Sequence, residues 1–177
     1  LEPQEIAGLA RQIAKGLRDI HRAGCVHADL KPENIFRARN ISRPHWKIAD
    51  FGLSRRAPED ETQTISLTPA YAAPELYRGR PCTASDIYAM GLILAEAATG
   101  KRPQRGRHEG HAETIGDARL REFVQLCIDI DPRHRPNADQ CLIFLSDFGS
   151  STRIRRHVSD STLNHARTFL NAVCAEP

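Results

Sequence analysis

Polar side chains that could act on a phosphate cluster in the stretch VHADLKPENI, residues 26–35. Asp29, Lys31 and Asn34 are close enough in sequence for a pinned loop to direct all three into one cleft. A carboxylate there can accept a proton from an attacking hydroxyl, a lysine can neutralise a phosphate, and an asparagine carbonyl oxygen suits Mg²⁺. The same pattern also fits a solvated turn whose polar groups bind the local backbone.

A second acid, Asp50, favours the chemical interpretation. It follows a short apolar run and precedes Phe51 and Gly52 in the sequence IADFGL. A strand there would fix the direction of the acid, and the glycine would allow a sharp turn. Asp50 and Asn34 supply two oxygen ligands, the minimum for a Mg²⁺ that keeps water and phosphate oxygens as its other ligands. Two adjacent short strands would bring these ligands together.

Helices must supply most of the frame that positions these residues. Apolar side chains recur at three- and four-residue steps from Ile6 to Ile20, which predicts an amphipathic helix over residues 3–23, with Gly24 just beyond its end. Residues 83–100 are apolar on nearly all sides. A helix of that kind is buried, so this one is expected at the centre of the domain.

Further helices are predicted towards the end of the chain. Residues 117–130 are amphipathic, with Asp117 as the N-cap, and Pro136 suits the first turn of another helix. We expect residues 147–177 to form a polar linker and a final helix.

The remaining segments are predicted to be short strands and loops. Short strands are expected before the loop that holds Asp29, after it at 35–36, and again within residues 45–53, where Gly52 follows the β-like run. Residues 54–75 have no sustained period and read as a long surface loop. Residues 100–111 read as a basic loop whose charge is solvated.

Composition restricts the class of protein. The 177 residues carry a net charge of +3, too small an excess to indicate nucleic acid, and no apolar run is long enough to span a membrane. The five cysteines are scattered and form no CxxC pair, which favours reduced, buried thiols inside the cell, in the cytoplasm or nucleus. His108 and His111 are one residue too close for a zinc-protease HExxH motif.

Five landmarks in order resemble the catalytic domain of eukaryotic protein kinases. They are HADLKPEN at 27–34, DFG at 50–52, APE at 73–75, SDIYAMG at 85–91 and DPRHRP at 131–136. The resemblance implies a mainly α fold with short β hairpins, namely the large helical C-terminal lobe of a kinase-like α+β fold over residues 1–146. The family resemblance implies ATP and Mg²⁺ as cofactors. Lys31 in this loop resembles the serine/threonine branch of the family, which implies a protein substrate with a serine or threonine acceptor.

The resemblance also implies a role for each site residue. Asp29 is the catalytic base, Lys31 stabilises the transferring phosphoryl group, and Thr68 braces both. Asn34 and Asp50 hold Mg²⁺.

Other positions take structural or nucleotide-binding roles by the same resemblance. Phe36 contacts the adenine ring, and Phe51 and His27 pack in an internal hydrophobic column. Glu75 and Arg135 form a buried ion pair that holds the loop. The hydroxyls of the activation segment that are candidate phosphorylation sites are Thr62, Thr64 and Ser66.

Three departures from the family pattern bear on activity. Ala28 stands where the family has an arginine that receives the activation-segment phosphate, so activity is expected to depend little on phosphorylation there. The 177 residues contain no G-x-G-x-x-G loop and begin at Leu1, so we expect a processed or excised chain or a fragment, without the N-terminal lobe and a poor catalyst alone. The segment 101–116 is shorter than the family's docking region.

Two other functions remain open at this point. One is a truncated, non-catalytic kinase-like protein that acts by binding or as a scaffold. The other is a small-molecule kinase of related fold, although such enzymes rarely carry the APE and DPRHRP segments.

Overall fold

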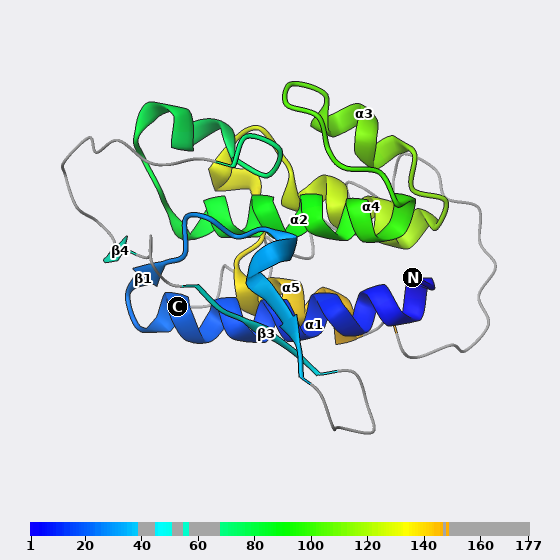
Figure 1. The fold of residues 1–177 in the computed structure, drawn as a ribbon, viewed down its shortest axis with the longest axis horizontal. Helices are drawn as coiled ribbons and strands as arrows, with labels where there is room; N and C mark the ends of the chain where they lie inside the picture. Colours follow the sequence, from blue (N-terminus) through cyan, green and yellow to red (C-terminus); the bar gives the residue numbers. More distant parts are fainter. Residues whose placement is uncertain (39–44, 51–54, 57–67, 147, 149–177) are drawn as a thin grey trace.

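The computed structural model describes residues 1–38, 45–50, 55–56, 68–146 and 148. Within them the order of elements is α1 (Pro3–Arg22), β1 (Cys25–Val26), the 3₁₀ turn η1 (Pro32–Asn34), β2 (Ile35–Arg37), β3 (Trp46–Ile48), β4 (Arg55–Arg56), η2 (Pro74–Arg78), α2 (Thr83–Thr99), α3 (His108–Glu113), α4 (Ala118–Cys127), η3 (Pro132–His134) and α5 (Ala138–Ser146). The predicted class, mainly helical with short β hairpins, agrees with this order (Figure 1).

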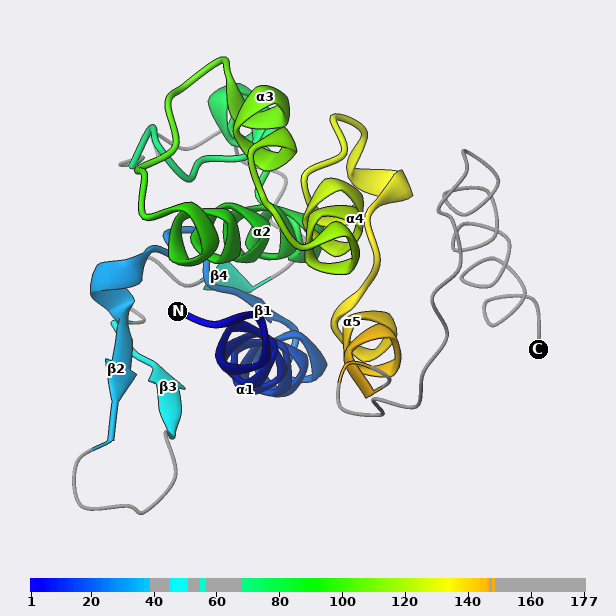
Figure 2. The ribbon, with the colours of Figure 1, turned by 90° about the vertical axis from the view of Figure 1, so that its right-hand side faces the viewer.

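Helix α2 forms the centre of the molecule, as its apolar sequence predicted. Every residue from Ser85 to Ala95 is buried, and α1 and α4 pack on α2 (Figures 1 and 2). The approach of α4 is close, because a Cβ added at Gly91 would lie 2.8 Å from the Cβ of Cys127 and from a methyl of Ile128. A glycine at this point of α2 therefore sets the distance between the two helices.

Helix α1 follows its predicted apolar face. Ile6, Leu9, Ile13 and Leu17 are buried, and the face contacts both α2 and α5. Gly24 follows the helix end with a φ of +73°, a left-handed conformation that glycine adopts without strain.

The later helices are where the predicted boundaries differ from the structure. Helix α4 has Asp117 as its N-cap, with the carboxylate accepting a hydrogen bond from the N–H of Leu120 at 2.8 Å, but it ends at Cys127, before residue 130. Pro136 lies outside α5, because Asn137 and Gln140 exchange side-chain to backbone hydrogen bonds of 2.8 and 2.9 Å that begin the helix there.

Two predicted loops contain regular structure. The basic segment 100–111 was expected to be a loop throughout, but α3 begins at His108. The expected loop 54–75 contains β4, which pairs with β1. A strand of two residues is too short for sequence periodicity to indicate it. The predicted linker and helix of 147–177 fall almost entirely outside the described residues.

The β2–β3 hairpin projects to one side of the helices (Figure 2). The strands are antiparallel, with Ile35 opposite Ile48. The backbone N–H of Trp46 donates to the side-chain oxygen of Gln12 at 2.6 Å, which fastens the hairpin to α1.

The cysteines are less uniform than predicted. Cys127 and Cys141 are buried, but Cys25 and Cys82 are only partly so, and all four are free thiols.

Candidate active site

The backbone of the loop at residues 27–28 is fixed by one buried acid, Asp86 of α2. Its carboxylate accepts the N–H groups of His27 and Ala28, each at 2.9 Å, and lies 2.8 Å from Nε2 of His21. Ala28 has a φ of +66°, which costs a non-glycine residue on the order of 1 kcal/mol, and the two hydrogen bonds to Asp86 hold it there. The direction in which the next residue, Asp29, points is therefore set by α2.

The carboxylate of Asp29 is held from two sides. Thr68 Oγ1 donates to one oxygen at 2.8 Å, and Lys31 Nζ lies 2.6 Å from the other. Lys31 Nζ is also 3.4 Å from Thr68 Oγ1, which closes a triangle of polar contacts between residues far apart in sequence. Both charged side chains stay partly accessible, Asp29 at 11% and Lys31 at 24%.

Lys31 is surrounded by negative charge. The hydrogen bond that Lys31 donates to Asp29 raises the pKa of Lys31, and the charges of Asp29, Glu33 and Asp50 add to this against a smaller opposing effect of burial. Lys31 is therefore a firmly charged ammonium group that senses both Asp29 and Asp50.

Asn34 and Asp50 lie at the adjacent ends of β2 and β3. The backbone N–H of Ala49 donates to the carbonyl of Asn34 at 2.9 Å. The side-chain amide of Asn34, which is buried, donates to the carbonyl of Asp29 at 2.9 Å. Because Nδ2 makes that bond, Oδ1 is the atom of Asn34 suited to a cation. Asp50 adopts a φ of +62°, an unusual conformation for a residue that is not glycine.

His27 connects the loop to the segment before Asp50. Its Nδ1 accepts the N–H of Asp29 at 3.4 Å, so the ring proton is on Nε2, which lies 3.2 Å from the carbonyl of Ala49. The side chain is fully buried, so this bridge is a fixed part of the frame.

Asn34 and Asp50 offer oxygen atoms, the kind of ligand that Mg²⁺ prefers. In the described part of the chain, no group of three or more histidine, cysteine, aspartate or glutamate side chains could hold a metal, and this includes His108 and His111. Asn34 and Asp50 alone would leave most positions around Mg²⁺ to water and phosphate oxygens, which is how Mg²⁺ is usually bound.

Of the residues predicted to bind the nucleotide or to belong to the activation segment, only some lie in the part of the chain that the structure describes. Phe36 is on β2 with 56% of its surface exposed, so its ring is presented to solvent. Phe51 and the candidate phosphorylation sites Thr62, Thr64 and Ser66 lie outside the described residues.

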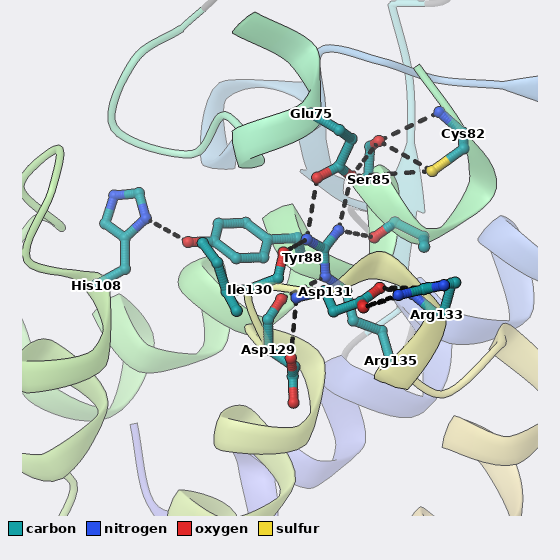
Figure 3. Close-up of polar contacts among 11 residues, drawn as sticks. Glu75, Cys82, Ser85, Tyr88, His108, Asp129, Ile130, Asp131, Arg133 and Arg135 are labelled. Atoms are coloured by element: carbon teal, nitrogen blue, oxygen red, sulfur yellow. Dashed lines mark hydrogen bonds and ion pairs between the residues drawn. The ribbon is translucent and has the colours of Figure 1, made fainter. Parts of the chain in front are cut away.

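A second polar cluster is centred on Glu75 and Arg135 (Figure 3). Two nitrogens of Arg135 bind the two oxygens of Glu75 at 2.7 and 3.0 Å. Ser85 donates to Glu75 at 2.7 Å, and the guanidinium group stacks over the ring of Tyr88, 4.6 Å from its centre. The predicted ion pair is confirmed by these contacts.

Burial and pairing act against each other on this cluster. Burial alone would raise the pKa of Glu75, but the hydrogen bonds from Arg135 and Ser85 outweigh it, and the pKa is lower than usual. Burial raises the pKa of Tyr88 to about 12. Tyr88 is therefore a neutral hydroxyl at ordinary pH, and Glu75 is an ion.

The structure thus brings Asp29, Lys31, Asn34 and Thr68 together, with Asp50 beside them. The sequence interpretation missed His21, the side chain that contacts the acid holding the loop. A signal was present, because His21 lies four residues after Leu17 on the apolar face of α1. A polar residue on a buried face requires a partner.

Comparison with known proteins agrees with this geometry. A protein kinase domain model matches residues 1–144. The chain belongs to the protein kinase family. The kinase relatives include serine/threonine-protein kinase PkaA of Streptomyces coelicolor, 34% identical over 155 residues that cover 78% of this chain and 28% of the relative. Serine/threonine-protein kinase mos of Xenopus laevis is 36% identical, covering 75% of this chain and 44% of the relative.

A third relative, serine/threonine-protein kinase ULK3 of Rattus norvegicus, is 32% identical, with 75% of this kinase chain and 32% of the relative covered. The chain therefore spans less than half the length of these three relatives. Among the described residues of the kinase chain, no helix is both long and apolar enough to cross a membrane.

Proposed function

We propose that the chain is the C-terminal lobe of a serine/threonine protein kinase that transfers the γ-phosphate of ATP to a protein hydroxyl. In this proposal residues 1–146 form the lobe, and residues 147–177 form a linker and a terminal helix. The support is the position of Asp29, whose carboxylate is oriented by Thr68, a residue 39 positions away in the sequence. The scattered free cysteines are consistent with a protein of the cell interior.

Asp29 is the proposed catalytic base. Its carboxylate orients the substrate hydroxyl and accepts its proton, while Thr68 and Lys31 fix the carboxylate's rotation. Lys31, charged because of its acidic neighbours, stabilises the negative charge that develops on the transferring phosphoryl group.

Asn34 and Asp50 are the proposed Mg²⁺ ligands, and Phe36 is the proposed contact for the adenine ring. Mg²⁺ bound with the nucleotide would neutralise phosphate charge. The chain's contribution is to aim Oδ1 of Asn34 and the carboxylate of Asp50 from two hydrogen-bonded strand ends, so that little reorganisation is needed when the nucleotide binds.

The test is phosphate transfer from ATP to a serine- and threonine-containing protein, with a tyrosine-only polymer as the contrast acceptor. The protein used is that of the complete reading frame that encodes these residues. Asp29→Asn keeps the shape and removes the base, so we expect a rate lower by about 10²–10⁴-fold. Asp19→Asn is the matched control, because Asp19 is an exposed acid that pairs with its neighbour Arg18.

Equal rates for Asp29→Asn and the control would contradict the assignment of the base. Transfer to the tyrosine polymer alone would contradict the acceptor class. No transfer by the unmodified protein would favour the non-catalytic binding function. The 177 residues tested alone should be slow, because they contain no glycine-rich G-x-G-x-x-G loop over the nucleotide.

A further inference from the structure

A cavity of about 890 Å³ lies between the segment 101–114 and the segment that follows Thr68. Its walls include Ala72, Pro74 and Tyr77 on one side and the basic segment on the other. Ile130, an apolar side chain that is 66% exposed, also lines it. No role proposed above uses this cavity.

The cavity is lined by more positive than negative charge. Lys101, Arg102, Arg105 and Arg107 all line it, against a single carboxylate, that of Glu109. All four basic residues are exposed, and none of them forms an ion pair with any residue that the structure describes. Their charge is therefore available to an anion from outside.

Two of the guanidinium groups are seated on aromatic rings. Arg105 lies over Tyr77 at 4.3 Å from the ring centre, and Arg102 lies over Tyr71 at 5.7 Å. Stacking of this kind holds the plane of the guanidinium group and leaves its N–H groups for an oxyanion. Tyr71 is itself fixed, since its hydroxyl donates to Glu96.

A buried histidine in the same wall has a ring nitrogen without a partner. Nδ1 of His108 lies 2.8 Å from the hydroxyl of Tyr88 (Figure 3). Nε2 of His108 is buried and has no hydrogen-bond partner among the described residues. A buried polar atom in this condition is destabilising, and a bound group that pairs with it can recover the loss.

The cavity adjoins the proposed active site. Ala72 lines both this cavity and the small pocket that contains Asp29 and Thr68. The N–H of Tyr71 donates to the carbonyl of Thr68 at 3.0 Å, so the ring that seats Arg102 belongs to the same turn as the residue that orients Asp29. A chain whose hydroxyl lies at Asp29 has this cavity within reach.

We propose that this cavity docks an acidic segment of the protein substrate, through carboxylate or phosphate oxygens bound by Arg102 and Arg105. The identity of the occupant as a substrate rests on the proposed kinase function, but the binding itself does not. Charge complementarity carries the choice of an acidic segment. The basic lining does not continue past Ile130. A second cavity of about 370 Å³, which Ile130 also lines, has the carboxylates of Glu109, Glu113 and Asp129 in its wall and would repel an acidic segment.

The test measures binding and requires no phosphate transfer, so it can fail independently of the proposed function. Fluorescence anisotropy would follow three labelled peptides of one glycine-serine sequence, carrying a glutamate triplet, phosphoserines or a lysine triplet. The site variant is Arg102→Glu with Arg105→Glu. The control is Lys15→Glu with Lys47→Glu, two exposed lysines outside the cavity, which changes the net charge by the same amount.

We expect the glutamate or phosphoserine peptide to bind and the lysine peptide not to bind. The site variant should bind the acidic peptide about tenfold more weakly, and the control variant should bind within about twofold of the unmodified chain. The stronger of the two acidic peptides identifies the oxyanion. The proposal would be overturned if the two variants weakened binding of the acidic peptide equally, or if the lysine peptide bound. It would also be overturned if a single-stranded DNA oligonucleotide displaced the labelled acidic peptide as well as the unlabelled acidic peptide does.

Discussion

The chain contains two acid–cation pairs of similar geometry in different surroundings. Lys31 lies 2.6 Å from Asp29, and Arg135 lies 2.7 Å from Glu75. The lysine is 24% exposed, whereas the arginine side chain is fully buried. The two pairs are therefore alike in distance, and they differ in the burial of the cation and in its remaining hydrogen bonds.

The buried pair has its hydrogen-bonding capacity fully used. Arg135 also donates to the carbonyls of Ala84 and Asp129, at 3.0 and 2.7 Å. Lys31 and Asp29 instead share Thr68, and both side chains stay partly accessible, at 24% and 11%. The cluster of Glu75 and Arg135 is closed around its buried cation, and the cluster of Asp29 and Lys31 is more open, as the proposed function requires.

Removing the cation from each pair should therefore have unequal consequences for stability. Arg135→Met removes a cation that is fully buried and that also binds the carbonyls of Ala84 and Asp129, so we expect the free energy of unfolding to fall by about 3–5 kcal/mol. Lys31→Met removes a cation that is 24% exposed and leaves Thr68 donating to Asp29, so the loss should be less than about 1 kcal/mol. Urea unfolding of the two variants checks this, and equal losses would remove the distinction between the pairs.

Substitution of Asp86 tests how far the conformation of the loop that holds Asp29 depends on helix α2. Asp86→Asn weakens charge-assisted hydrogen bonds to His27 and Ala28, which hold the strained loop backbone. We expect a loss of about 2–3 kcal/mol in unfolding free energy, together with faster amide exchange at those two residues. Unchanged exchange would mean that the loop keeps its conformation without Asp86.

Both clusters are attached to α2, so the packing of that helix should affect both. Gly91→Ala adds a methyl 2.8 Å from Cys127 and Ile128, and we expect a loss of about 1–3 kcal/mol from overpacking. Gly8→Ala in α1 meets nothing within 4 Å and should stabilise the chain by up to about 1 kcal/mol. Thermal unfolding compares the two, and a gain at Gly91 would show that α4 moves aside easily.

Acid should weaken the closed cluster, through protonation of Glu75. The pKa of Glu75 in the folded chain is below its ordinary value of 4.5, because pairing outweighs burial. The stability that it contributes is present above about pH 4.5 and is lost as the pH falls through the folded pKa. Unfolding free energies from pH 6 to 3 should therefore decline less steeply for Glu75→Gln than for the unmodified chain. Parallel curves would contradict this.

The sequence was informative where a pattern extends over several turns or over a local motif. The apolar face of α1 and the apolar surround of α2 predicted both helices, and motif order indicated which polar residues would meet. Short elements were harder to predict from the sequence. The two-residue strand β4 and the start of α3 depend on pairing and packing with distant segments, which no local period encodes.

The contacts of the candidate site depended on the fold in the same way. Thr68 was connected to Asp29 by resemblance alone, because 39 residues separate them and only the packed structure supplies the 2.8 Å contact. The cavity of the basic segment 101–114 was not foreseen, since its charges read as a solvated loop until the rings beneath Arg102 and Arg105 were located.

The most direct test of the central claim is urea unfolding of Asp29→Asn beside Glu75→Gln. Each variant replaces one carboxylate by its uncharged amide. The account predicts a change of less than about 1 kcal/mol for Asp29→Asn, since the Lys31 cation that it leaves is 24% exposed, and a loss of about 3 kcal/mol or more for Glu75→Gln, since the Arg135 cation that it leaves is fully buried. Equal losses, or a larger loss for Asp29→Asn, would contradict it.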